Sequence, residues 1–377
     1  MERDYLQLKL NEFAKEYPNY EFTQLFYSPE EVRINFIISA LAGKGPDLIH
    51  CASDFIGPLS ELQVIHPLEN LFEETFLDSF IQEPVAANTF FQNHLYQIAD
   101  RVGNHLCLVY NKALVKEPPQ SMAELIKLKD QLVKDTDGDG DSDTYVLAWN
   151  YTEPAFAVPF IGGYGGWIVD ENRNPTLNTE AVVNAAQLIY DLANKHRIIP
   201  RESDYETANA LFMDRRVAMI INGPWSWGTY LKNNIDIGLA RIPKIDETGL
   251  WPTPTVFPMG YCFNVNLSGD RLDMLVSLVK YLTSHETELD FAVRFNIIPS
   301  RLETLHHESL IENEIFQQAL DQMMVGRPMP VFTEMRWIWD AMRPAYQGIF
   351  TNQISPREAA TQMQELALKL IKENRDE

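Results

Sequence analysis

Hydrophobic positions follow two different repeats along this chain. Where apolar residues recur every three to four positions the pattern predicts amphipathic helices, and where they alternate or run continuously it predicts strands. Helices are predicted over residues 5–17, 29–42, 121–134, 181–193, 204–213, 271–283, 285–295, 309–324 and from 355 onward. Strands are predicted at 20–26, 47–49, 145–149, 217–221, 235–242, 259–265 and in two apolar runs within 90–112. This alternation predicts an α/β fold of mainly parallel sheets flanked by helices.

The stretch ALFMDRRVAMIINGPWSW, residues 210–227, has the clearest pattern in the chain. A charged turn leads into the apolar run 217–221, which is bounded by turn signals and therefore predicts a buried strand. The run breaks at Asn222-Gly223-Pro224, and we expect Trp225 and Trp227 to project from the following loop. In open α/β sheets, ligands bind beyond the carboxyl ends of the strands. The two indoles are therefore candidate ligand contacts; the alternative is that they cover a core.

Length and charge narrow the class of protein. A chain of 377 residues is longer than one hydrophobic core usually supports, so two lobes are expected. No run of about 18 uncharged apolar residues occurs, so no transmembrane helix is predicted. The sequence has 53 acidic against 31 basic residues and a net charge of −22, which argues against binding to nucleic acid or anionic membrane. The first twenty residues lack the features of a signal peptide, so either the protein is cytoplasmic or an export signal is not part of this sequence.

The three cysteines, Cys51, Cys107 and Cys262, are widely spaced and form no CxxC motif. Neither a zinc framework nor a redox pair is indicated by this spacing. Each cysteine lies in an apolar, strand-like setting, so buried structural thiols are predicted.

The acidic stretch DTDGDGDSDTY is a candidate cation site. Positions 1, 3, 5 and 9 of an EF-hand-like loop are occupied by Asp135, Asp137, Asp139 and Asp143. Gly140 stands at the turn position, but position 12 is Val146, so the usual bidentate carboxylate is absent. Two interpretations remain open: a structural calcium site, or an acidic turn that is simply solvated.

The motif FxxxxxAMxINGPWxW resembles the bacterial extracellular solute-binding proteins of the maltose/oligosaccharide type, which serve ABC importers. The segments FAKEYPNYEF, KGPDLI, LVYNK and IPSR match the same family, and the resemblance covers essentially the whole chain after Tyr5. It implies a two-lobed periplasmic-binding-protein fold of type II. Lobe I is then expected at 1–103 and 246–305, and lobe II at 104–245 and 306–377. Hinge crossings are expected near 103–107, 245–260 and 301–309.

Members of this family normally begin with a strand that lies centrally in the sheet of lobe I. No strand-like residues precede Tyr5, so this first strand is expected to be absent. Its loss would leave unpaired backbone groups, at about 1–3 kcal/mol for each buried group. We therefore expect the sequence to start downstream of the mature start, and no ligand contacts are assigned to the missing strand.

Sugar ligands need flat apolar faces for their C–H surfaces and planar, multidentate partners for their hydroxyl groups. The resemblance, residue by residue, places such groups at Asp54, Asn104, Glu153, Trp225, Trp339 and Arg343. Tyr261 is added because of its position on the strand that follows the second crossing. Trp339 and Arg343 are one helical turn apart, so both side chains can reach the same ligand.

Other interpretations of these residues remain open. Either indole could belong to a core, strand-end carboxylates such as Asp54 and Glu153 often cap helices, and Arg343 could pair with a carboxylate. The chain also departs from the maltose binders, with Cys51 in place of a Trp and Phe55 in place of an Arg. A stacking face and a hydrogen-bond donor are lost in lobe I, which favours a glycan other than maltose.

The leading hypothesis is a substrate-binding component of an ABC importer that closes two lobes over a disaccharide or oligosaccharide. The resemblance implies a membrane permease as partner, an extracytoplasmic location (periplasmic or lipid-anchored), a monomer, and no required cofactor. One alternative is a glycosidase that uses Asp54 and Glu153 as a carboxylate pair, although no GxSxG nucleophile motif is present. Another is a sugar-binding sensor that is not part of a transporter.

Overall fold

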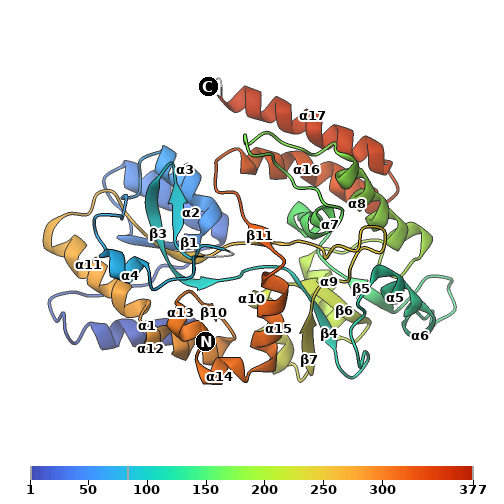
Figure 1. The fold of residues 1–377 in the computed structure, drawn as a ribbon, viewed down its shortest axis with the longest axis horizontal. Coiled ribbons are helices and arrows are strands. Elements are labelled where there is room, and N and C mark those ends of the chain that lie inside the picture. Colours follow the sequence, from blue (N-terminus) through green and yellow to red (C-terminus); the bar gives the residue numbers. More distant parts are fainter. Residues whose placement is uncertain (1, 83–84, 376–377) are drawn as a thin grey trace. The chain divides into compact units, whose positions relative to one another are not determined.

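The computed structural model describes residues 2–82 and 85–375, which divide into two units (Figure 1). Unit 1 takes the chain up to Asn104 together with Val256–Phe316 and Pro328–Phe332. Unit 2 takes His105–Thr255, Gln317–Arg327 and the chain from Thr333 onward. No helix in the described part of the chain is long and apolar enough to cross a membrane.

These boundaries correct parts of the expected lobes. Residues 246–255 belong to unit 2, whereas residues 306–316 and 328–332 belong to unit 1. The first two crossings fall inside the ranges 103–107 and 245–260, but the third comes after Phe316 and not near 301–309. The chain stays longer in unit 1 because the short helices α13 (Leu302–Leu305) and α14 (Glu308–Ile311) pack against α12 (His285–Phe295).

Unit 1 combines one sheet with helices that cover it. Its other helices are α1 (Glu2–Phe13), α2 (Pro29–Leu41), α3 (Ile56–Glu61), α4 (Glu74–Leu77) and α11 (Gly269–Leu282), with a 3₁₀ turn η1 (Ser53–Phe55). Its strands are β1 (Leu48–Ala52), β2 (Thr89–Phe91), β3 (His94–Val102), β9 (Met259–Phe263) and β10 (Ile298–Pro299). Two short strands, β8 (Thr255–Val256) and β11 (Arg327–Pro328), pair where the chain changes units.

Unit 2 has a smaller sheet and more helix. Its helices are α5 (Met122–Lys127), α6 (Lys129–Leu132), α7 (Val158–Gly163), α8 (Glu180–Tyr190), α9 (Tyr205–Met213), α10 (Pro224–Lys232), α15 (Glu314–Met323, which begins in unit 1), α16 (Met335–Phe350) and α17 (Pro356–Arg375). A 3₁₀ turn η2 (Pro154–Ala157) and a π-helical turn η3 (Asp191–Lys195) complete it, with strands β4 (Cys107–Asn111), β5 (Tyr145–Ala148), β6 (Val217–Asn222) and β7 (Ile237–Ala240). The long helix α17 packs along α16 and α8 (Figure 1).

Helix starts agree with the capping signals in the sequence. At α17, where a helix is predicted from residue 355 onward, Ser355 and Glu358 form a capping box: the Ser355 N–H donates to Glu358 Oε2 at 3.2 Å and the Glu358 N–H donates to Ser355 Oγ at 3.3 Å. Ser121 likewise accepts the Glu124 N–H at 3.3 Å. The predicted helix 121–134 is nevertheless two short helices, α5 and α6, separated at Leu128.

Strand directions differ from the expectation of mainly parallel sheets. The sheet of unit 1 has the order β1-β9-β3-β10 with β2 on β3, and all of these pairs are antiparallel. In unit 2 the order is β5-β6-β4-β7, and the single parallel pair is β5–β6. Strands β1 and β3 do run in the same direction, but β9 lies between them in the opposite direction. Alternating helices and strands predict parallel pairs only where successive strands are neighbours, and here a later strand separates them.

The strand predicted at 20–26 is wrong, because residues 20–28 have no regular secondary structure. Leu25 and Phe26 are 59% and 60% exposed. Within the described residues no strand precedes α1, and β1 pairs only with β9. An alternating sequence forms a stable strand only beside a partner that takes up its hydrogen bonds, and none is present for this segment.

Candidate functional site

Trp225 lies directly after the buried end of β6. All six residues of β6 are buried, and its last residue, Asn222, donates through Nδ2 to the Tyr230 hydroxyl at 2.8 Å. Gly223 follows, where an ideal Cβ would lie 2.2 Å from the Trp225 ring. The glycine therefore lets the indole lie back over the strand end. Trp225 is 47% exposed, so nearly half of its surface is accessible to solvent.

The expected loop at this point is a helix, and only one of its two indoles is exposed. Helix α10 begins at Pro224, a position at which proline is favourable because its missing N–H has no helical partner. Residues two apart in a helix are rotated by about 200° and so face opposite sides. Trp227 is accordingly 1% exposed, in the core beside Cys107. The expectation that both indoles project is wrong for Trp227.

Tyr205 is a neighbour of Trp225 that sequence reasoning missed. It is the first residue of α9, whose cap Asp204 accepts the Thr207 N–H at 2.7 Å. Burial raises the pKa of Tyr205, and its interaction with the Trp225 side chain opposes that rise. The N-cap signal at Asp204 marks where this helix starts, but nothing local in the sequence joins Tyr205 to Trp225.

Glu153 and Arg343 lie together in unit 2. Glu153 follows β5 and caps η2, where its carboxylate accepts the Ala155 N–H at 3.5 Å. Arg343 Nη1 donates to Glu153 Oε2 at 3.0 Å and to Thr152 O at 2.9 Å. The two side chains are 39% (Arg343) and 37% (Glu153) exposed, so each keeps polar atoms that can bond a ligand. The capping role and the pairing role foreseen as alternatives are both present.

Trp339 and Arg343 share one face of α16, four residues apart. The flanking Ile338 is buried and Asp340 is exposed, so Trp339, half-buried, lies at the border between core and surface. The long helix therefore presents an aromatic and a cationic side chain one turn apart. Glu153, held by Arg343, belongs to the same part of unit 2.

The three remaining candidates lie in unit 1. Asp54 is partly buried in η1, immediately after β1. Asn104 follows β3 in a left-handed conformation with φ 38°, next to Gly103 with φ 105°. Tyr261 lies in the middle of β9 and is 7% exposed, the least accessible of the seven candidates. Burial raises the pKa of Tyr261 well above its usual value.

Tyr261 belongs to a polar network on the unit 1 sheet that no pattern in the sequence predicted. Its ring is 5.0 Å from that of His50 on β1, between centroids, and His50 Nε2 is 3.0 Å from Asp100 Oδ1. Arg101 donates two hydrogen bonds of 3.0 Å to the Asp100 carboxylate. Burial alone would raise the pKa of Asp100, but Arg101 and His50 hold it far below its usual value. Asp100 is therefore a structural carboxylate whose charge is matched within the sheet.

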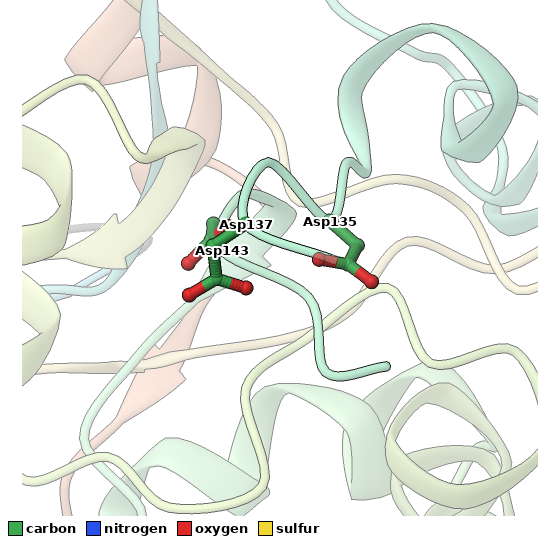
Figure 2. A group of neighbouring side chains, drawn as sticks. All are labelled: Asp135, Asp137 and Asp143. Atoms are coloured by element: carbon green, nitrogen blue, oxygen red, sulfur yellow. The ribbon is translucent and has the colours of Figure 1, made fainter. Parts of the chain in front are cut away.

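The aspartate loop brings together three of its four predicted ligands. Carboxylate oxygens of Asp135, Asp137 and Asp143 all lie within 4.8 Å of one another (Figure 2). Asp139 is not in this group; its Oδ1 accepts the Asp141 N–H at 2.8 Å. Oxygen ligands suit a hard cation, but calcium usually takes six to eight of them. Calcium binding here stays a prediction.

Two hollows in the surface of unit 2 have none of the candidate ligand residues in their linings. One of about 340 Å³ is lined by Ala193, Asn194, Arg197, Arg201, Glu202, Phe350, Thr351 and Asn352. The other, of about 360 Å³, is lined by Gln120, Leu239, Ala240, Arg241, Trp251 and Asp321. Both are open to solvent, and neither contains a tryptophan predicted to stack on a ligand.

The sequence matches a known protein family over most of its length. The sequence pattern of the family described as bacterial extracellular solute-binding protein matches residues 2–287, three quarters of the chain. The chain belongs to this family. The sequence resemblance first seen around Trp225 is thereby confirmed.

Individual relatives extend the match to the whole chain. The maltose/maltodextrin-binding domain MalE from Bdellovibrio bacteriovorus, solved bound to maltotriose, is 39% identical with a TM-score of 0.90, covering 98% of this chain and 97% of that one. The maltotriose-binding protein of Pyrococcus abyssi is 26% identical over 318 residues, 82% of this chain and 66% of its own length. A maltooligosaccharide ABC transporter solute-binding lipoprotein of Streptococcus pneumoniae is 24% identical, covering 73% of this chain and 64% of its own length.

The chain thus spans just under two thirds of these two full-length relatives and nearly all of the solved domain. The fold is the two-lobed α/β fold of the type II periplasmic binding proteins, as the family members have it.

Proposed function

We propose that this solute-binding protein is the substrate-binding component of an ABC importer and that its ligand is an oligosaccharide. The observation that carries the proposal is the 39% identity, over 98% of the chain, to a domain that was solved with maltotriose bound. The named transporter lipoprotein of S. pneumoniae supports the assignment to an importer. We propose that a membrane permease is the partner and that the protein acts outside the cytoplasm, as a monomer.

The side chains of unit 2 have the chemistry that a sugar requires. The open face of Trp225 can stack on the C–H surface of a sugar ring, and Trp339 offers a second aromatic surface. The Glu153–Arg343 pair offers both acceptors and donors to hydroxyl groups. We propose that these four residues bind the ligand from lobe II.

From lobe I we propose Asp54 and Asn104 as further polar contacts, with Tyr261 contributing only the small part of its ring that is exposed. A ligand that contacts residues of both lobes stabilises the closed form and not the open one. Only such a difference in affinity can shift the population toward closure. The sugar is released chemically unchanged, and no cofactor takes part.

Binding and catalysis can be separated in one experiment. The protein is titrated with maltose, maltotriose, longer malto-oligosaccharides and trehalose in a calorimeter, and each sugar is then analysed by chromatography. Saturable binding with the sugar recovered intact supports the proposal. Released monosaccharide would support the alternative of a glycosidase using Asp54 and Glu153, and the absence of binding to any oligosaccharide would refute the proposed ligand class.

A sensor that binds sugar without transport requires a different measurement. Uptake of labelled maltotriose is compared in cells with and without the gene for this protein. Uptake that depends on the protein supports the importer, whereas unchanged uptake together with tight binding in vitro would favour the sensor.

A further inference from the structure

The paired strands β1 and β9 carry two of the three cysteines. In their register Cys51 lies opposite Gly260 and Cys262 lies opposite Ile49, so the cysteines are diagonal neighbours on one face of the sheet. Their sulfur atoms are 3.8 Å apart. Cys51 is 3% exposed and Cys262 is 0% exposed, so the pair is enclosed.

The surrounding residues direct the two sulfurs toward each other. An ideal Cβ on Gly260 would lie 2.1 Å from the carbonyl oxygen of Ile98 on β3, so the position opposite Cys51 has no room for a side chain. The Cys51 side chain therefore meets the diagonal residue, Cys262. Gln97, on β3, also contacts the pair. Its Nε2 donates to Cys51 O at 2.8 Å and lies 3.8 Å and 3.9 Å from the sulfurs of Cys51 and Cys262.

The two sulfurs are close together but not at bonding distance. A disulfide has an S–S length of about 2.05 Å, so the two sulfurs must approach by about 1.8 Å. In the proposed bond this approach would come from rotation about the two Cα–Cβ bonds, with the register of the strands unchanged. The bond would close a loop between residues 211 positions apart.

We propose that Cys51 and Cys262 form a disulfide when the protein folds outside the cytoplasm, and that Cys107 remains a free thiol. The oxidant is a second disulfide, from a small molecule or an oxidoreductase, as oxidising compartments provide. Its S–S bond breaks as the Cys51–Cys262 bond forms, and the two thiol hydrogens end on its two sulfur atoms. Cys107 lies on β4 in unit 2, which contains no other cysteine, and its sulfur is 3.5 Å from Asn222 O.

The disulfide should form during folding and not after the protein has folded. The neighbouring Cys262 thiol and burial both raise the pKa of Cys51, which keeps it protonated once the sheet has formed. Thiolate is the attacking species in disulfide exchange, so a buried, protonated thiol reacts slowly. We therefore expect the bond to form while β1 and β9 are pairing.

The bond would also hold two candidate ligand elements together. Strand β1 leads directly into Asp54, and β9 carries Tyr261. The disulfide does not depend on which ligand the protein binds, so it can be tested independently of the proposed ligand.

The test is a map of the cysteines in the full chain. The chain is refolded from denaturant in reduced and oxidised glutathione, then alkylated under denaturing conditions and digested for mass spectrometry. We expect alkylation at Cys107 alone, and a cross-linked Cys51–Cys262 peptide lighter by two hydrogen atoms than the two thiol peptides together. Reduction should lower the melting temperature by about 5 °C or more, because the loop is long. Three alkylated cysteines, or a bond that includes Cys107, would overturn the proposal.

Two variants serve as controls. Cys107→Ser should keep the cross-linked peptide and lose the alkylated one. Cys262→Ser should lose the cross-link and the sensitivity of the melting temperature to reductant. If Cys262→Ser does not fold, the peptide map of the unmodified sequence decides the question alone.

Discussion

Glu288 has a buried carboxyl group whose protonation state can be inferred from its hydrogen bonds. It lies on α12, 2% exposed, and its Oε2 accepts the N–H groups of Ser300 and Arg301, both at 3.0 Å. Its Oε1 makes a short hydrogen bond with Ser300 Oγ, which is also 2.8 Å from Ala99 O. A hydroxyl has one hydrogen to donate. If Ser300 donates it to Ala99 O, the hydrogen in the short bond must come from protonated Glu288.

The pKa of Glu288 agrees with a protonated carboxyl, and its shift determines how much the proton contributes to the free energy of unfolding. Burial raises the pKa from its ordinary value of 4.5 to about 8. The difference, 8 − 4.5 = 3.5 pH units, corresponds to roughly 5 kcal/mol at 1.36 kcal/mol per unit. The folded state keeps its proton where the unfolded chain has already lost it. This contribution to stability is therefore complete below pH 4.5, declines as the pH rises to about 8, and is lost above it.

Glu288→Gln should remove this pH dependence. An amide keeps a donor for Ser300 Oγ and an acceptor for the two N–H groups, but it does not titrate. We expect the variant to match the unmodified protein near pH 5 and to exceed its free energy of unfolding by several kcal/mol, at most about 5 kcal/mol, above pH 8.

The measurement is urea unfolding at a series of pH values, followed by circular dichroism. All seven tryptophans belong to unit 2, so tryptophan fluorescence would not report on α12. Glu286→Gln, at an exposed position on the same helix, is the matched control and should leave the pH dependence unchanged. Parallel pH profiles for Glu288→Gln and the unmodified protein would refute the reasoning.

Three other predictions concern the ligand and the metal. Trp225→Ala should weaken maltotriose binding by roughly 1–3 kcal/mol in calorimetry and leave the ligand-free melting temperature nearly unchanged. Trp227→Ala, in the core, should instead lose about 3–5 kcal/mol of unfolding free energy. The reverse pattern would exclude Trp225 as a stacking residue. Arg343→Ala should reduce the affinity for maltotriose in the same titration. It should change the free energy of unfolding by less than about 1 kcal/mol, since the pair with Glu153 is partly exposed. A large loss of stability with unaltered affinity would mean that the pair has a structural role only. Chelator should lower the melting temperature if the aspartate loop holds calcium, with Asp135→Asn insensitive to it, and identical melting curves would reject the metal.

Much of the local structure could be predicted from the sequence because its causes are local. The apolar run of β6, the capping box at Ser355 and the helix over 285–295 each depend on residues within a few positions of one another. The motif around Trp225 is also local, and it indicates the family by itself. Exposure of Trp225 at the end of β6 belongs to the same local pattern.

Other features depended on which segments meet, and local patterns do not contain that information. The segment 20–26 alternates like a strand but has no partner, and β9 enters between β1 and β3 to make the unit 1 sheet antiparallel. A helix at 224–232, and not a loop, turns Trp227 into the core.

The same limit applied to the chemistry. The sequence by itself determined which residue types were available: three separate cysteines, a carboxylate after each of two strands, and an aspartate-rich loop. Only the tertiary structure decided that Cys51 lies beside Cys262 and that Glu153 is held by Arg343. The reason is physical: periodicity records which face of an element is buried, whereas a contact between residues about 200 positions apart is fixed only when the sheets and helices pack.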